Sequence, residues 1–583
     1  MTLRISLVVV LLAAIIATPF LLRPEGEKEG IDLGTAERVV VITPHNESIQ
    51  SEFGRAFRRH MREKHGRDVY VDWRQPGGTS EIAKFLESEF TVRFEQQWKK
   101  RTGLPFSNRI REAFADRKLA PFPETEQQGW IDDPTLLRDE DDETRARAAR
   151  TLFLQSSVGA GIDLFFGGGA YDFSKQAQIG NLVATDPTGS YGPGALARRE
   201  PDWFSPDVMP AMVSGEPFRD ADYRWVGTVL SAFGLCYNTE VVERLGFESG
   251  LTSWEDLADP RLFGQVALAD PTKSGSTTKA FEMLIQEQIQ KELQSRMAEA
   301  RSAESIEADA VRDGWMNAMR LISRISANGR YFSDSATRVP HDVAMGDAAA
   351  GMSIDFYGRT YNEIHRDETG HSRVQFVMPR GGTSIGADPI GMLRGAPNPE
   401  LADRFIEFVL SMEGQQLWNY RPGTEGGPLR FALRRPPIRL DFYTPERKRW
   451  QSDPDVNPYE IAEGFTYHGE WTGPLFSALR FVIRAACVET QEELADCWDA
   501  LIRAGFPPGA MEEFDDLDRI SYQRTTDEIA PVLRAGDKVA EVKLGRDLST
   551  YFRKKYRRVE EMAKEAAQER RDVPFPAPGT APH

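Results

Sequence analysis

Short apolar runs, polar loops and segments with helical spacing alternate along the first part of the chain. Residues 37–43 and 68–73 are apolar enough to form buried strands, and each is followed by a polar loop and then by a helical segment. This order of strand, loop and helix predicts a parallel sheet with helices on its faces. In such sheets ligands bind beyond the carboxyl ends of the strands, where the helices begin.

The polar loops at these strand ends are therefore candidate ligand-binding segments. Another one follows the apolar run 266–269, where Asp270-Pro271 ends the strand and a small polar segment opens a long helical pattern. Backbone N–H groups and hydroxyls at a helix start are available to a ligand. A capped helix after a turn explains the same residues. The candidates are His45, Asn46, Glu47, Gly78, Thr79, Ser80, Gly168, Gly169, Ser274, Gly275, Ser276 and Thr277.

Two long stretches depart from this alternation. Residues 91–156 are rich in charged side chains and include the run DEDDETRARAAR, which predicts a helical insertion with solvated faces. Residues 436–571 predict a mostly helical C-terminal extension. The proline-rich residues 572–583 predict a disordered tail.

The N-terminus has the pattern of an export signal. Arg4 precedes an uncharged apolar run, residues 5–22, which is followed by a charged segment. The run is close to the lower length limit for spanning a bilayer. Residues 1–30 therefore predict either a cleaved signal peptide or a retained inner-membrane anchor, and a periplasmic or otherwise extracytoplasmic location for the rest of the chain.

Composition limits the possible functions. The 583 residues carry a formal net charge of −17, and this acidic balance argues against nucleic acid as a partner. The length suits two to four domains. Three cysteines exclude a disulfide framework, although Cys487 and Cys497 remain a possible pair. Phosphate-binding glycine motifs, nucleophile elbows and zinc-spaced histidines are absent from the sequence. We therefore expect a binding protein without a cofactor, and not an enzyme.

The order of segments resembles the type II periplasmic solute-binding proteins of ABC importers, and within them the ferric-iron-binding class. The strongest likeness is SWEDLADPRLFGQVALADPTKSGSTTKAF, residues 253–281. The other carrying segments are VVVITPHNES (39–48), AGIDLFFGG (160–168), GLCYNT (234–239), VAMGDAAAGMSIDFYG (343–358) and ADRFIEFVLSMEGQQLW (402–418). The resemblance covers most of residues 37–430 apart from the insertion.

The resemblance implies an α/β fold with two lobes, joined by crossover strands, that close on a ligand by hinge motion. Lobe one would comprise residues 37–228 and 385–435, and lobe two residues 229–384. The protein would be a monomer that delivers its ligand to an ABC permease. The alternative is an anchored sensor or scaffold, in which the insertion and the extension bind a partner protein.

Two classes of ligand remain open. In the ferric class, tyrosines from lobe two bind iron with a histidine and a carboxylate from lobe one. His45 matches the histidine, Tyr357 lies near the tyrosine position and Asp355 is adjacent, so these three are the metal ligands if the solute is ferric iron. However, the paired tyrosines are absent, and glycines replace the expected carboxylate after the third strand. The Gly-, Ser- and Thr-rich loops suit a small anion. Arg359 is either an added charge at this site or a surface residue.

Overall fold

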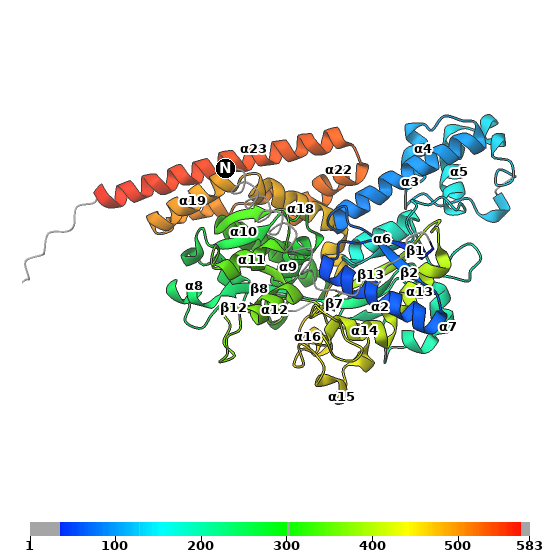
Figure 1. Cartoon of the computed structure of the whole chain (residues 1–583). Helices are drawn as coiled ribbons and strands as arrows, with labels where there is room; N and C mark the ends of the chain where they lie inside the picture. The colour runs from blue at the N-terminus through cyan, green and yellow to red at the C-terminus, as the bar shows by residue number, and fades with distance from the viewer. Residues whose placement is uncertain (1–34, 127–128, 300–302, 573–583) are drawn as a thin grey trace, which may run out of the picture.

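The computed structural model describes residues 35–126, 129–299 and 303–572, and its strands form two main sheets (Figure 1). The first sheet has the order β2-β1-β3-β13-β4, with β7 also paired to β13. Its strands are β1 (Glu37–Ile42), β2 (Val69–Arg74), β3 (Leu164–Phe166), β4 (Leu182–Val183), β7 (Val226–Ser231) and β13 (Gly386–Leu393). The second sheet has the order β10-β9-β11-β8-β12. Its strands are β8 (Phe233–Asn238), β9 (Val266–Ala269), β10 (Gly329–Ser333), β11 (Ala350–Ile354) and β12 (Val374–Val377).

The apolar run of β1 is continuous because both faces of the first sheet are covered. Val39 and Val41 belong to one hydrophobic core, whereas Val40 and Ile42 belong to another on the opposite face. β1 pairs in parallel with β2 and β3, as the strand, loop and helix order predicts. The lobe-one helices are α2 (Glu47–His65), α3 (Thr79–Thr102), α6 (Ala170–Ile179), α7 (Pro193–Arg199), α13 (Pro399–Leu410) and α14 (Met412–Asn419).

The crossover between the lobes lies at Ala232. The apolar stretch 225–238, which the sequence predicts as one strand-like run, is split there: β7 pairs with β13 in the first sheet, and β8 pairs with β11 and β12 in the second. The first sheet therefore extends to Ser231, beyond the predicted lobe boundary at 228. The chain returns between β12 and β13, where the Thr383 hydroxyl accepts a hydrogen bond from the Phe233 N–H, at 3.1 Å.

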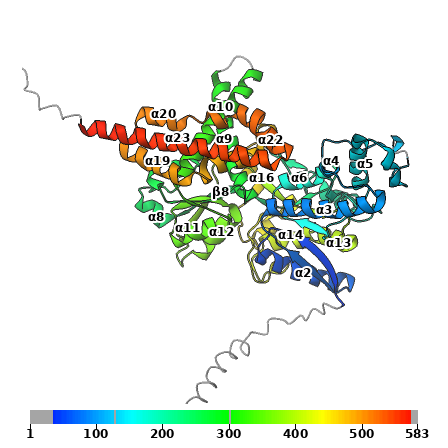
Figure 2. The ribbon, with the colours of Figure 1, turned by 90° about the horizontal axis from the view of Figure 1, so that it is seen from above.

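Lobe two and the C-terminal extension share one hydrophobic core. The Trp315 indole donates to the Ile520 carbonyl at 2.9 Å, and the Trp498 indole donates to the Asn328 side chain at 2.9 Å. The lobe-two helices are α8 (Thr239–Arg244), α9 (Gly275–Glu299), α10 (Ala303–Ala327), α11 (Arg338–Met345) and α12 (Asp355–Ile364). The long last helix crosses this lobe (Figures 1 and 2). The extension helices are α15 (Pro445–Lys448), α16 (Pro458–Ala462), α17 (Gly469–Thr472), α18 (Phe476–Ile483), α19 (Gln491–Ala504), α20 (Pro508–Asp515), α21 (Tyr522–Arg524), α22 (Ala530–Ala535) and α23 (Lys538–Asp572).

The insertion projects from lobe one (Figure 1). Helix α3 starts in lobe one and runs unbroken into the insertion, where α4 (Asn108–Ala113) and α5 (Asp142–Leu154) pack against it. Phe94 and Phe153 are buried there, with ring centroids 5.3 Å apart. The predicted fold class, two α/β lobes with a helical insertion and a mostly helical extension, is thus confirmed.

The predicted signal or anchor in residues 1–30 lies outside the described residues, as does the predicted tail after residue 572. Within the described part of the chain, no helix is both long and apolar enough to cross a membrane.

Cys487 and Cys497 are buried free thiols and do not pair. The sequence analysis did not predict β10, β4 or the small hairpin of β5 (Met212–Val213) and β6 (Glu216–Pro217).

Candidate functional site

The loops that follow β1, β2 and β3 meet at one edge of the first sheet. Gly167 and Gly168 have φ of +89° and +109°, and a Cβ atom at either position would lie 2.4 Å from a neighbouring side chain, the His45 ring or Thr79. Glycine is required here because its backbone approaches these two side chains closely in a left-handed conformation. The glycines thus bring the predicted site residues of lobe one together.

A guanidinium from the last residue of lobe one fills the space beside His45. The fully buried Arg435 donates to the Asp388 carboxylate at 2.5 Å, and its other terminal nitrogen lies 3.2 Å from His45 Nε2. The Arg435 guanidinium also lies 4.4 Å from the centre of the Phe356 ring. Arginine can only donate, so Nε2 accepts and the imidazole is neutral. Burial, and then the Arg435 charge, hold the pKa of His45 well below its usual value.

The predicted residues of lobe two reach the same region from helix α12. Burial raises the pKa of Tyr357 to about 12, so its phenol stays protonated at physiological pH. Asp355 is buried and forms an ion pair with Arg359 at 2.5 Å, whereas its second oxygen has no hydrogen-bond partner among the described residues. Arg359 also donates to the carbonyl of Arg434 at 3.1 Å. The surface position considered for Arg359 is therefore wrong: only 11% of its side chain is exposed.

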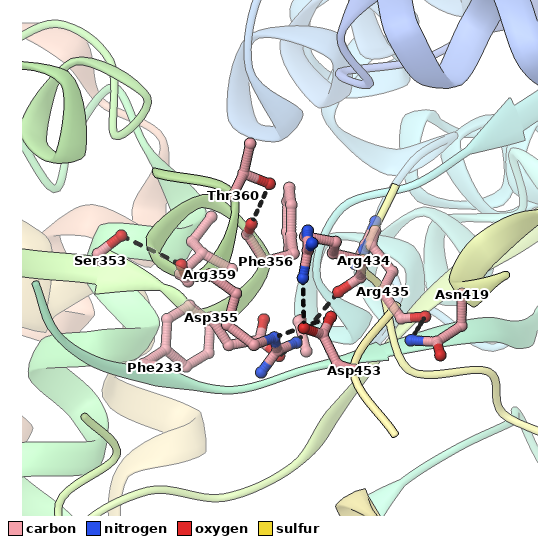
Figure 3. A network of polar contacts seen from close by, with 12 residues as sticks. Phe233, Ser353, Asp355, Phe356, Arg359, Thr360, Asn419, Arg434, Arg435 and Asp453 are labelled. Carbon is pink, nitrogen blue, oxygen red and sulfur yellow. Dashed lines mark hydrogen bonds and ion pairs between the residues drawn. The ribbon is translucent and has the colours of Figure 1, made fainter. Parts of the chain in front are cut away.

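Figure 3 shows this network, which joins lobe two to the end of lobe one and to Asp453 in the segment that follows. Asp453 accepts from Arg434 at 2.5 Å and lies 3.6 Å from Arg359. Arginines and aspartates alternate here, so each buried charge faces an opposite one. Within the residues that the structure describes, no group of three or more His, Cys, Asp or Glu side chains is placed to hold a metal ion.

A second polar centre lies where helices α3, α6 and α9 begin. A Cβ atom on Gly275, the first residue of α9, would lie 3.9 Å from Ser80 Oγ and 3.7 Å from Asp172 Oδ2. A Cβ atom on Gly78 would lie 3.0 Å from the Lys273 carbonyl. The candidate loops of the two lobes therefore face each other across the lobe interface. Helix α18 of the extension adds Arg480, which donates to Ser80 Oγ at 2.8 Å.

The remaining candidates lie around these two centres. Asn46 and Ser274 cap helices α2 and α9, accepting from the Ile49 N–H at 3.1 Å and the Thr277 N–H at 3.2 Å. Thr277 is buried in the first turn of α9, next to the half-buried Ser276. Gly169 is the N-cap of α6, and Glu47 is exposed at the start of α2.

Sequence reasoning missed several charged residues of the two centres. Arg435 stands in the segment RRPP, where a charged pair before two prolines at the end of the family-like region was an available signal. Arg480 and Asp172 lie in helical segments whose sequence gives no sign that they approach the lobe interface. Asp388 lies in the glycine-rich return segment, which the sequence assigned to lobe one without a role for its carboxylate.

Comparison with known proteins agrees with this fold. Residues 158–429 match the family model of bacterial extracellular solute-binding proteins. An uncharacterized protein from Haemophilus influenzae is 24% identical over 255 residues, which are 44% of this chain and 60% of that protein. The chain thus spans about 60% of the length of this curated relative. Residues 158–429, a little under half of the chain, therefore resemble extracellular solute-binding proteins, as the motifs of the sequence predict.

Solved structures of periplasmic binding proteins are also similar. The periplasmic binding protein AfuA from Actinobacillus pleuropneumoniae, solved with exogenous fructose-6-phosphate bound, is 17% identical; the match covers 65% of this chain and 81% of that one, with a TM-score of 0.39. Iron-bound HitA from Pseudomonas aeruginosa is 13% identical, with 76% and 98% covered and a TM-score of 0.42.

Proposed function

We propose that the protein is the extracytoplasmic receptor of an ABC importer and that it binds a small anion, rather than ferric iron, between its lobes. The observation that carries the choice of ligand is the position of Arg435. Its guanidinium lies between Asp388 and His45, and His45 is one of the three metal ligands that the ferric-binding resemblance implies. A trivalent cation there would meet a fixed positive charge, and Asp388 is already paired.

The protonation state of Tyr357 at this centre also favours an anion over ferric iron. Iron coordination by Tyr357 needs a phenolate, and burial raises the pKa of that phenol to about 12. An anion instead finds donors at the helix starts of both lobes, where backbone N–H groups and the positive ends of the helix dipoles are available. In this proposal the protein works as a monomer outside the cytoplasm and passes the anion to a permease.

Thermal unfolding of the purified full-length chain tests the proposal. The panel contains inorganic phosphate, sulfate, sugar phosphates, dicarboxylates, ferric citrate and, as the matched control for iron, citrate alone. A ligand at a hundred times its dissociation constant adds about 2.7 kcal/mol of stability. We expect a shift with at least one anion and the same response to ferric citrate as to citrate. A larger shift with ferric citrate than with citrate would contradict the choice of ligand.

The sensor or scaffold alternative is favoured by a different observation. The Lys279 ammonium, on α9, lies 2.8 Å from Glu216 of lobe one and 2.9 Å from Glu282 of α9. The ring of Tyr467 from the extension covers it at 3.7 Å, and the Tyr467 hydroxyl donates to Glu282 at 2.9 Å. The extension thus ties the two lobes together, which restrains the hinge motion that a transport receptor uses. No thermal shift with any solute of the panel would favour this alternative.

A further inference from the structure

We infer that the C-terminal extension completes the ligand site, with Arg480 and Asp172 binding opposite ends of a hydroxylated organic anion. The inference rests on the proposed function and names the ligand class more narrowly. The family match ends at residue 429, so a ligand contact from α18 lies outside the matched region. Three kinds of observation support it: the anchoring of Arg480, the state of Asp172 and the convergence of helix starts.

Arg480 is anchored at the lobe interface with hydrogen-bonding capacity left over. One terminal nitrogen donates to Ser80, while the buried Nε has no hydrogen-bond partner in the part of the chain that the structure describes. Helix α18 is held in place by Tyr171, the second residue of α6, whose hydroxyl lies 3.0 Å from Ser477 Oγ and whose ring packs on Phe476 at 4.5 Å. These contacts hold the guanidinium of a helix in the extension against the start of a lobe-one helix.

Asp172 is a buried carboxylate without a bonding partner. Only 6% of the residue is exposed, and among the described residues its carboxylate forms no hydrogen bond and no ion pair. Burial raises the pKa of Asp172, and the charge of the nearby Arg480 opposes that rise. Its Oδ2 faces the start of α9, where a Cβ atom on Gly275 would lie 3.7 Å away. The carboxylate thus keeps its acceptor capacity for a ligand that donates a hydrogen bond.

The chemistry of the centre selects a ligand with two different ends. The starts of α3, α6 and α9 and the Arg480 guanidinium provide donors and positive charge for an anionic group. The Asp172 carboxylate accepts from a hydroxyl and repels an anion that has no hydroxyl donor beside its charge. A hydroxylated anion, such as a polyol phosphate, satisfies both, whereas inorganic sulfate leaves the carboxylate unpaired. The geometry therefore points to recognition of an anionic group by Arg480 and of a hydroxyl by Asp172.

Calorimetric titration of the full-length chain with glycerol 3-phosphate and with inorganic sulfate tests this inference. The variants are Arg480→Gln, Asp172→Asn and the matched control Arg484→Gln, which removes an exposed arginine one turn further along and paired with Glu489. We expect wild type to prefer glycerol 3-phosphate. Arg480→Gln should weaken its binding by about 10- to 100-fold, the value of a charged hydrogen bond, and Arg484→Gln should leave it unchanged.

The Asp172→Asn variant separates recognition from simple electrostatics. Replacing the carboxylate should lower the ratio of the affinity for glycerol 3-phosphate to the affinity for sulfate, because sulfate is no longer repelled. Circular dichroism and the melting temperature of each variant show whether it is folded, and Arg480→Lys serves as a second substitution that keeps the charge. If Arg480→Gln binds glycerol 3-phosphate as tightly as the wild-type chain does, the inference is overturned and the receptor proposal stands. If the wild-type chain binds neither this probe nor any other anion of the thermal panel, the inference and the receptor proposal are both overturned.

Discussion

Replacing Arg435 by leucine tests whether this guanidinium holds the first polar centre together. Arg435 is fully buried and donates to Asp388 at 2.5 Å, and the only other side chain that hydrogen-bonds to that carboxylate among the described residues is the Ser231 hydroxyl at 3.3 Å. The Asp388 side chain is only 17% exposed, so Arg435→Leu leaves a largely buried carboxylate without its counter-charge. Breaking a buried ion pair in this way costs about 3–5 kcal/mol, because the remaining charge is not compensated.

The loss of stability in Arg435→Leu should be larger at high pH than at low pH. In the wild-type chain burial raises the pKa of Asp388, and Arg435 opposes that rise. Without Arg435 the pKa of Asp388 in the folded variant is higher still. A carboxyl with a higher pKa in the folded than in the unfolded state destabilises the fold when it is ionised, so the penalty is complete above the folded pKa. It falls as the pH drops through the folded pKa and vanishes below the unfolded value.

Urea unfolding, followed by tryptophan fluorescence at pH 7.5 and pH 5.5, measures both effects. We expect Arg435→Leu to lower the free energy of unfolding at pH 7.5 by about 3–5 kcal/mol. The deficit should be smaller at pH 5.5. The control is Arg435→Leu combined with Asp388→Asn, which removes both charges and should recover most of the loss. A loss below about 1 kcal/mol that is independent of pH, or no recovery in the double variant, would refute the reasoning.

Two further substitutions test other parts of the structure. Lys279→Met leaves the buried carboxylates of Glu216 and Glu282 without a counter-charge, so we expect the free energy of unfolding in urea to fall by about 3–5 kcal/mol. We also expect a larger radius of gyration in solution scattering. An unchanged radius would argue against a tie between the lobes. Gly168→Ala forces a Cβ to 2.4 Å from a side chain of α3 at a φ of +109°, so it should cost about 1–3 kcal/mol in thermal unfolding. Gly169→Ala is its matched control, because nothing lies within 4 Å of that Cβ, and an equal loss in both variants would contradict this explanation.

The lobes could be predicted because their strands are either continuous apolar runs or parts of recognisable segments. Residues 39–42 of β1 and all of β9 are buried and apolar, so no polar residue obscures their pattern. β10 escaped prediction because its middle residues, Arg330, Tyr331 and Phe332, are exposed or half-buried and so do not form an apolar run. The split at Ala232 was also hidden, since β7 and β8 are both fully buried and the run is apolar throughout.

The site was predictable only as far as it depends on local order. Loops at strand ends lie at one edge of a sheet, so the placement of His45 and Ser80 near the lobe interface follows from the order of elements. The contacts of Arg435 and Arg480 join residues 390 and 400 positions apart in the chain, and such pairings have no local signature. The role of the extension therefore became visible only once its helices were placed against both lobes.

Direct binding of ferric iron and of an anion by the same wild-type preparation tests the central claim, that the protein binds an anion between its lobes. Isothermal titration would use glycerol 3-phosphate in one series and ferric nitrilotriacetate in the other, with nitrilotriacetate alone as the blank. The account predicts saturable heat near one equivalent for glycerol 3-phosphate and none beyond the blank for ferric iron. Stoichiometric binding of ferric iron that gives a visible phenolate-to-iron absorption band, lost in Tyr357→Phe, would contradict it.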